Sequence, residues 1–76
     1  MKYSARQRAV AAALRKARER AGLSQRQLSE RLQQPPNWIQ RIESLERRVD
    51  VAEFIAIAKA LGADPAELFQ GALDGS

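Results

Sequence analysis

The chain has 76 residues, enough for one domain, which we expect over residues 1–76 with a core at about 4–70 and short mobile termini. It contains no cysteine and no histidine, which argues against a disulfide framework, a thiolate metal site and histidine catalysis, so we expect no cofactor and no metal. The longest apolar run, residues 9–14, is too short for a membrane span or an export signal, and we expect a cytoplasmic protein.

The net charge of +4 is unevenly distributed along the chain. Residues 1–48 hold twelve Lys or Arg against four acids, a net of +8, whereas residues 49–76 hold Lys59 against five acids, a net of −4. A basic first part and an acidic second part predict that a polyanion docks to one side of the molecule. The alternative is a solubilising surface on which like charges cluster by accident.

Helix signals recur along the chain, and strand signals are nearly absent. A first helix is predicted over about residues 4–21, because apolar side chains return at three- and four-residue spacing. Gly22 is expected to end it in the left-handed conformation. Ser24 then caps a second helix, and Gln27 completes its capping box.

The third helix is expected to begin at Pro35 or Pro36. Backbone N–H groups in the first turn of a helix have no hydrogen-bond partner within the helix, so the N–H that proline lacks is not missed there. Ile39 and Ile42 are its predicted core positions. These residues place a short helix about three residues after the second one, the spacing of a helix-turn-helix unit.

Two further helices follow, each opened by an acidic N-cap. Asp50 and Glu53 form a capping box for the fourth helix, which Gly62 is expected to stop. Asp64 caps the fifth helix, which is expected to end at Gly71. The predicted fold is therefore all-α, a compact bundle of five short helices.

Three segments together resemble the Cro and phage-repressor (XRE-type) helix-turn-helix DNA-binding family. They are GLSQRQLSERL at 22–32, IQRIE at 39–43 and ALG at 60–62, and the resemblance spans about residues 14–69. It implies a sequence-specific regulator that binds double-stranded DNA, a repressor acting as a homodimer on an inverted repeat. It also implies a bacterial or phage-type protein associated with the nucleoid.

The outer face of the third helix is the predicted base-reading surface. With the isoleucines inward, Asn37 and Arg41 fall on the opposite side, and such side chains can bond bidentately to adenine and guanine. The alternatives are a solvated charge at Arg41, paired with Glu46, and a backbone-serving role for Asn37. The full predicted base-reading set is Asn37, Arg41, Gln34, Gln40 and Ser44.

Phosphate contacts are predicted around this helix. A helix N-terminus attracts phosphate, and the resemblance implies that Gln25 bonds the backbone and that Arg18 pairs with Glu43. The predicted phosphate-contacting set is Ser24, Gln25, Arg18, Arg47 and Arg48. The first few residues could form an arm along the duplex.

Three positions depart from the family pattern. Trp38 stands where the family usually has a small residue, and its ring could contact DNA, lean on a partner helix or complete the core. Gln33 and Leu45 stand where glycines are common. Without a glycine stop at 45, the third helix could continue through Arg48.

An enzyme is disfavoured, because the chain lacks histidine, cysteine and a glycine-rich phosphate loop. A membrane-binding first helix is also disfavoured, since its apolar face is mostly alanine. The main alternative is a protein-interaction module, an antitoxin or adaptor that holds a protein partner through the acidic part. For the dimer, the fifth helix and the tail are the expected contact.

Overall fold

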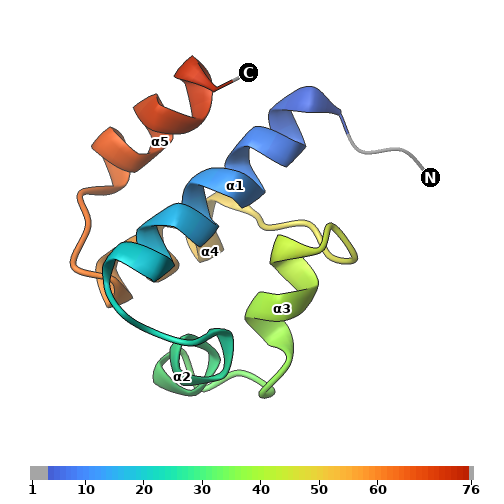
Figure 1. Ribbon diagram of the computed structural model, residues 1–76, viewed down its shortest axis with the longest axis vertical. Helices are drawn as coiled ribbons and strands as arrows, with labels where there is room; N and C mark the ends of the chain where they lie inside the picture. Colours follow the sequence, from blue (N-terminus) through green and yellow to red (C-terminus); the bar gives the residue numbers. More distant parts are fainter. Residues whose placement is uncertain (1–3, 76) are drawn as a thin grey trace.

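The computed structural model describes residues 4–75, and these form five helices without a strand (Figure 1). The helices are α1 (Ala5–Arg20), α2 (Gln25–Arg31), α3 (Trp38–Glu43), α4 (Val51–Ala60) and α5 (Pro65–Asp74). The all-α, five-helix prediction is confirmed. Within the described residues, no helix has both the length and the apolar character needed to cross a membrane.

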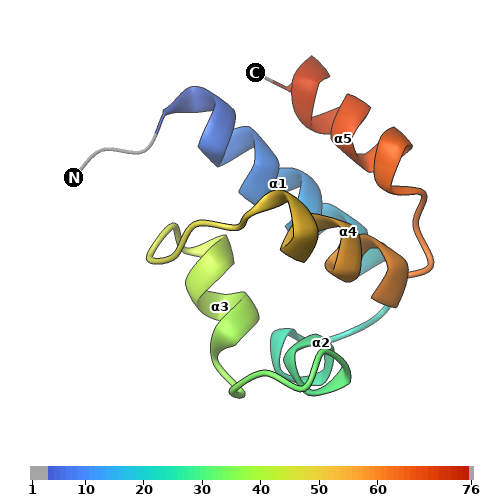
Figure 2. The ribbon, with the colours of Figure 1, turned by 180° about the vertical axis from the view of Figure 1, so that it is seen from behind.

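α1 and α5 run side by side in opposite directions, so the start of α1 lies next to the end of α5 (Figures 1 and 2). α4 lies behind α1 in Figure 1 and in front of it in Figure 2. α2 and α3 form the opposite end of the molecule, with α2 seen end-on beside α3. This end carries the helix-turn-helix unit.

The core lies where all five helices meet. Leu28, Ile42 and Ile57 are almost completely shielded from solvent, and they come from α2, α3 and α4. Both predicted core isoleucines of α3, Ile39 and Ile42, are buried. The remaining buried members of the cluster are Leu14, Ala17, Trp38, Phe54, Ala58 and Leu68.

The predicted N-caps Ser24, Asp50 and Asp64 are confirmed, and Ser4 also caps its helix. Ser4, Ser24 and Asp50 each close a reciprocal capping box with the residue three positions later. The Asp64 side chain accepts from the Ala66 N–H at the start of α5. These bonds satisfy N–H groups that have no partner inside their helices.

The start of α3 was predicted too early. Pro35 and Pro36 lie in a turn closed by a bond from the Trp38 N–H to the Pro35 carbonyl (3.0 Å), and Asn37 is the N-cap. A residue that precedes a proline is disfavoured in the helical region, so Pro35 could not begin the helix. The two prolines shape the approach to α3 rather than its first turn.

The end of α5 was also predicted too early. The helix continues through Gly71 to Asp74, and Gly75 is its C-cap. Ala72, one residue beyond the predicted stop, is buried. Burial of Ala72 stabilises another helical turn, so the glycine at position 71 does not end the helix.

α3 does not extend through Arg48. It ends at Glu43, and Leu45 takes the left-handed conformation with a φ of 66°. Gln33, after α2, does the same at 57°. Both chain reversals keep the geometry that glycine favours although neither residue is glycine.

Candidate nucleic-acid interface

Ser29 fixes α3 against α2. Its buried hydroxyl donates to the Gln25 carbonyl (2.9 Å) and accepts from the Ile39 N–H (3.0 Å). Asn37, the N-cap of α3, makes no side-chain capping bond. The backbone-capping alternative for Asn37 is therefore wrong, because Ser29 of the neighbouring helix supplies the cap. Ser29 was not among the predicted site residues, although its place next to the inward-facing Leu28 of α2 was an available signal.

A polar network joins three helices behind the candidate interface. The Glu43 carboxylate accepts from Arg18 Nε (2.7 Å), Arg18 Nη2 (3.1 Å) and Gln25 Nε2 (2.8 Å). Arg18 also donates to the Leu23 carbonyl (2.8 Å). The bond to Glu43 raises the pKa of Arg18 despite the opposing effect of burial. The Arg18–Glu43 pair inferred from the resemblance is present.

This network limits what its members can offer to DNA. The Arg18 side chain is only 12% exposed, so its guanidinium serves mainly the fold. Gln25 is half-buried and uses one of the two amide N–H groups of its side chain on Glu43, which leaves the second for another acceptor. In Ser24, the N–H and a hydroxyl lone pair serve the capping box.

The outer face of α3 carries exposed polar side chains. Asn37, Arg41 and Ser44 are exposed, as is Gln34 before the helix. Within residues 4–75, no ion pair involves Arg41, so the suggested pair with Glu46 is not formed. Arg41 therefore presents an exposed guanidinium on the surface predicted to read bases.

Glu46 instead bonds to two other members of the predicted set. Its Oε2 accepts from Ser44 Oγ (2.8 Å) and Gln40 Nε2 (3.4 Å). A carboxylate thus lies at the end of the base-reading surface.

One groove brings predicted base-reading and phosphate-contacting residues together. It encloses about 390 Å³ and is lined by Arg15, Arg18, Glu19, Gln25, Gln40, Glu43 and Ser44. Arg15 of α1 was not among the predicted contacts, yet it borders this groove. Its spacing of three residues from Arg18 would have placed both on one side of the helix.

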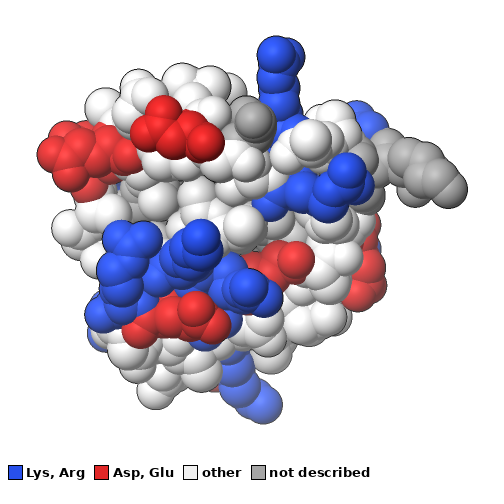
Figure 3. Space-filling view, turned by 45° about the horizontal axis from the view of Figure 1, so that its top comes forward, with Lys and Arg blue, Asp and Glu red and all other residues white. Residues whose placement is uncertain are grey.

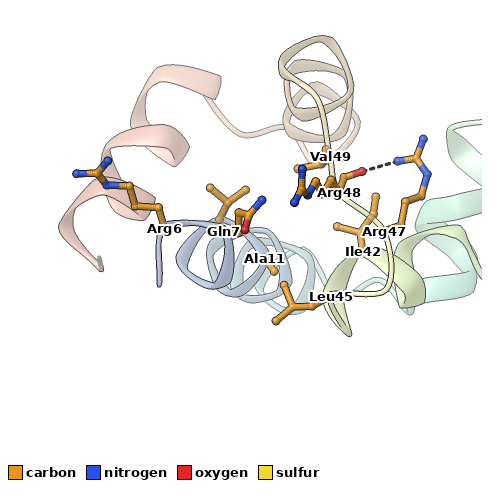
Figure 4. A pocket seen from close by; sticks show the side chains of 9 residues that line it. Arg6, Gln7, Ala11, Ile42, Leu45, Arg47, Arg48 and Val49 are labelled. Atoms are coloured by element: carbon orange, nitrogen blue, oxygen red, sulfur yellow. Dashed lines mark hydrogen bonds between the residues drawn. The ribbon is translucent and has the colours of Figure 1, made fainter. Parts of the chain in front are cut away.

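The Arg47 side chain bonds to other residues of the protein. It makes two bonds to the Glu53 carboxylate (3.0 and 2.7 Å) and one to the Arg48 carbonyl (2.9 Å), the latter drawn in Figure 4. Its guanidinium carbon lies 5.0 Å from the centroid of the Trp38 ring, within the range of a cation–π contact. The bonds raise the pKa of Arg47 and lower that of Glu53. Of the two loop arginines, Arg48 is the exposed one.

Trp38 belongs to the core. Only 7% of it is exposed, and Arg47 covers its ring. Of the roles open to this residue from sequence, packing is the one that the structure shows. The ring does not project from the surface.

A small hollow of about 190 Å³ lies between the start of α1 and the loop that follows α3 (Figure 4). Leu45 and Val49 contribute apolar walls, and Arg6 and Arg48 lie at its edges. The half-buried Leu45 side chain thus packs beside α1 while its backbone ends α3. Residues 1–3, where the suggested DNA-binding arm would begin, lie outside the described residues.

Figure 3 shows how charge is distributed on one face. Acidic side chains gather at the upper left, over α5, and basic ones at the lower left, over the second half of α1, with acidic groups among them. The two signs are therefore segregated only in part on this face.

Comparison with known proteins gives the family. Residues 9–69 match the helix-turn-helix domain family. The chain belongs to this family. Membership supports a DNA-binding transcriptional regulator and no enzymatic activity, and the turn between α2 and α3 is the defining feature.

Two solved structures are similar over most of the chain. An XRE-family like protein from Pseudomonas syringae pv. tomato is 36% identical, with a TM-score of 0.85, covering 92% of this chain and 85% of that one. The clp gene regulator ClgR from C. glutamicum is 26% identical, with a TM-score of 0.84, covering 97% and 95%. No curated protein gives a significant match.

Proposed function

We propose that this helix-turn-helix protein is a sequence-specific repressor that binds double-stranded DNA as a homodimer on an inverted repeat, in the cytoplasm at the nucleoid. α3 enters the major groove in this proposal. The observation that carries it is the outer face of α3, where Asn37 and Arg41 are exposed. Within residues 4–75, the Asn37 side chain makes no capping bond and Arg41 forms no ion pair. Their chemistry suits adenine and guanine edges.

The proposed base-reading set remains Asn37, Arg41, Gln34, Gln40 and Ser44. For phosphate, the groove that joins Gln25 to Gln40 and Ser44 favours a DNA strand passing between α1 and α3. Arg15 lines this groove and would contact that strand, and the exposed Arg48 in the loop after α3 would supply a further phosphate contact. Such contacts position the protein without reading sequence. Arg18 and Arg47 would support the neighbouring groups through their internal bonds.

The inverted repeat and the dimer follow from the size of the reading surface. α3 has only six residues and can contact few base pairs, so two copies give the specificity that one lacks. Exposed apolar side chains on α4 and α5 supply a surface for pairing, with Val51 77%, Ile55 40% and Phe69 51% exposed. These residues border one groove with Pro65 and Ala66.

The same apolar surface also favours the second candidate function, binding of a protein partner. Repression is preferred over activation because occupying the groove is by itself enough to exclude other proteins from that DNA. Activation would require a further contact to the transcription machinery.

The experiment is selection from a random double-stranded DNA library at two salt concentrations, followed by sequencing. We expect a short inverted repeat that survives the higher salt. Recovery of all sequences at low salt and none at high salt would mean that DNA binding is only non-specific electrostatic attraction. That outcome would favour the protein-partner function.

Arg41→Ala tests the base-reading role directly. The variant should bind the selected site more weakly by about 1–3 kcal/mol and lose discrimination at one base-pair position, because a bidentate contact is removed. Binding measured against a panel of single-base variants of the site checks this. Arg31→Ala, which changes another exposed arginine of the helix-turn-helix unit, should preserve discrimination. A panel that ranks identically for wild type and Arg41→Ala would remove Arg41 from base readout.

A further inference from the structure

An acidic side chain lies among the residues proposed to read bases. Glu46 Oε2 accepts hydrogen bonds from Ser44 Oγ at 2.8 Å and from Gln40 Nε2 at 3.4 Å. Glu46 is exposed, and within residues 4–75 it forms no ion pair. Its negative charge is therefore not neutralised by a neighbouring cation in that part of the chain.

The turn after α3 fixes this position. Leu45 reverses the chain at a φ of 66°, and the Glu46 N–H bonds back to the Arg41 carbonyl (2.8 Å). The paired bond from the Leu45 N–H to the Ile42 carbonyl (3.1 Å) completes this helix end. The reversal returns the chain toward the last turn of α3, and Glu46 lies beside Gln40 instead of continuing away from the helix.

A carboxylate at this place has a restricted choice of partners on DNA. It only accepts hydrogen bonds, so the acceptor atoms of guanine and thymine and the phosphate oxygens would all oppose it. The exocyclic amino groups of cytosine (N4) and adenine (N6) are the donors that the major groove offers, and glutamate accepts from cytosine N4.

We propose that Glu46 is a specificity-determining residue, which accepts a hydrogen bond from an exocyclic amino group in the major groove and disfavours sites that lack one. The inference rests on the proposed DNA-binding function and adds a residue to its reading surface. Glu46 also orients Gln40, because the Nε2 of that amide bonds to the carboxylate and its Oε1 is left for another donor. Discrimination between DNA sites then has two sources: the hydrogen bond that the carboxylate accepts at the correct site, and the unfavourable burial of the carboxylate at sites that lack an amino group.

The test compares three proteins by library selection and by affinity for single-base variants: wild type, Glu46→Gln and Glu67→Gln. Glutamine keeps the length of the side chain and can both donate and accept. Glu67 is exposed on α5, so its substitution makes the same change in net charge away from α3. Thermal unfolding of all three proteins verifies that each is folded.

We expect wild type to require cytosine or adenine at one position of each half-site, and the selected base identifies which amino group is bound. Glu46→Gln should lose this preference by on the order of tenfold, while preferences at the other positions persist. Glu67→Gln should keep the whole wild-type pattern.

Two outcomes would overturn the inference. If Glu46→Gln selects the wild-type sequence and, like Glu67→Gln, merely binds all DNA somewhat more tightly, Glu46 is only a surface charge. If wild type selects no sequence at all, the proposed function fails and the inference fails with it, so the wild-type arm separates the two cases.

Discussion

Gln33 and Leu45 adopt a left-handed backbone conformation that residues with side chains disfavour. Both have positive φ values, 57° and 66°, as do Gly22 and Gly62 at the ends of α1 and α4. At each of the four helix ends, the next residue donates its N–H to the carbonyl five positions earlier, as Gln34 does to Ser29 (3.0 Å). The left-handed conformation costs a residue with a side chain about 1–2 kcal/mol, so α2 and α3 end at some expense in stability.

Gln33→Gly should therefore stabilise the protein. The side chain is exposed, so little packing is lost, and we expect a gain of about 0.5–1 kcal/mol after the larger unfolded-state entropy of glycine is subtracted. Urea unfolding measures the change. Gln34→Gly, one residue later and also exposed, is the matched control and should give no gain. Equal effects of the two substitutions would show that the conformation at Gln33 is not strained.

At the level of the helices, two contacts hold α3 in place in addition to the Glu43 network with Arg18 and Gln25. Ser29 bonds the first turn of α3 to α2, and Arg47 joins Trp38 to Glu53 on α4. Both contacts lie behind the proposed reading surface. The position of α3 therefore depends on its neighbours more than on its own six residues.

Ser29→Ala should destabilise the fold by about 1–3 kcal/mol, because the buried Ile39 N–H loses its acceptor. Urea unfolding gives the magnitude, with Ser44→Ala as control, since that exposed hydroxyl should contribute within about 0.5 kcal/mol. A loss no greater than that of Ser44→Ala would mean that the bond does not hold α3.

The Arg47–Glu53 pair predicts a pH dependence. The bond from Arg47 is the largest cause of the lowered pKa of Glu53, which lies below its ordinary value of 4.5. A carboxylate whose pKa is lower in the folded state stabilises the protein above its unfolded pKa, and this stabilisation is lost as pH falls through the folded value. The melting temperature of wild type should therefore fall below about pH 4.5 more steeply than that of Glu53→Gln.

The difference should correspond to less than about 1 kcal/mol, because both side chains of the pair are partly exposed, 32% for Arg47 and 26% for Glu53. Circular dichroism melts of the two proteins between neutral and acid pH would measure it. Parallel curves would show that the pair does not stabilise the folded state.

At the scale of the whole molecule, the helix-turn-helix unit and the apolar α4–α5 surface are made by different helices (Figures 1 and 2). In the proposed dimer, this division would leave one region for DNA and the other for a second copy of the chain. Phe69 is the largest exposed apolar side chain on α5, and its ring contacts Phe54 edge-on, with centroids 6.1 Å apart.

Phe69→Glu should convert the proposed dimer to a monomer by placing a charge in the apolar contact. Analytical ultracentrifugation, with and without the selected DNA, measures the mass. Gln70→Glu adds the same charge at the next exposed position of α5 and should leave the dimer intact. A wild-type protein that stays monomeric in both conditions would contradict the proposed dimer.

Local chemistry in the sequence determined the number of helices, most of their caps and the two inward-facing isoleucines of α3, Ile39 and Ile42. Capping boxes and apolar spacing depend on residues three or four positions apart, so Ser24 with Gln27 and Asp50 with Glu53 could be identified without a fold. The Arg18–Glu43 pair, 25 residues apart, could be inferred only through the family resemblance. The same resemblance, and no local signal, marked Gln33 and Leu45 as unusual.

Only the tertiary structure decided which of two neighbouring arginines is half-buried against other side chains. Arg47 and Arg48 are adjacent in the sequence, yet Arg47 is bound to Glu53 and Trp38 whereas Arg48 is exposed. It also decided where α3 begins, because the cap comes from Ser29 of another helix, and where α5 ends, because Ala72 packs beyond Gly71. The physical reason is common to all three: hydrogen bonds and burial between distant segments exist only once the helices have packed.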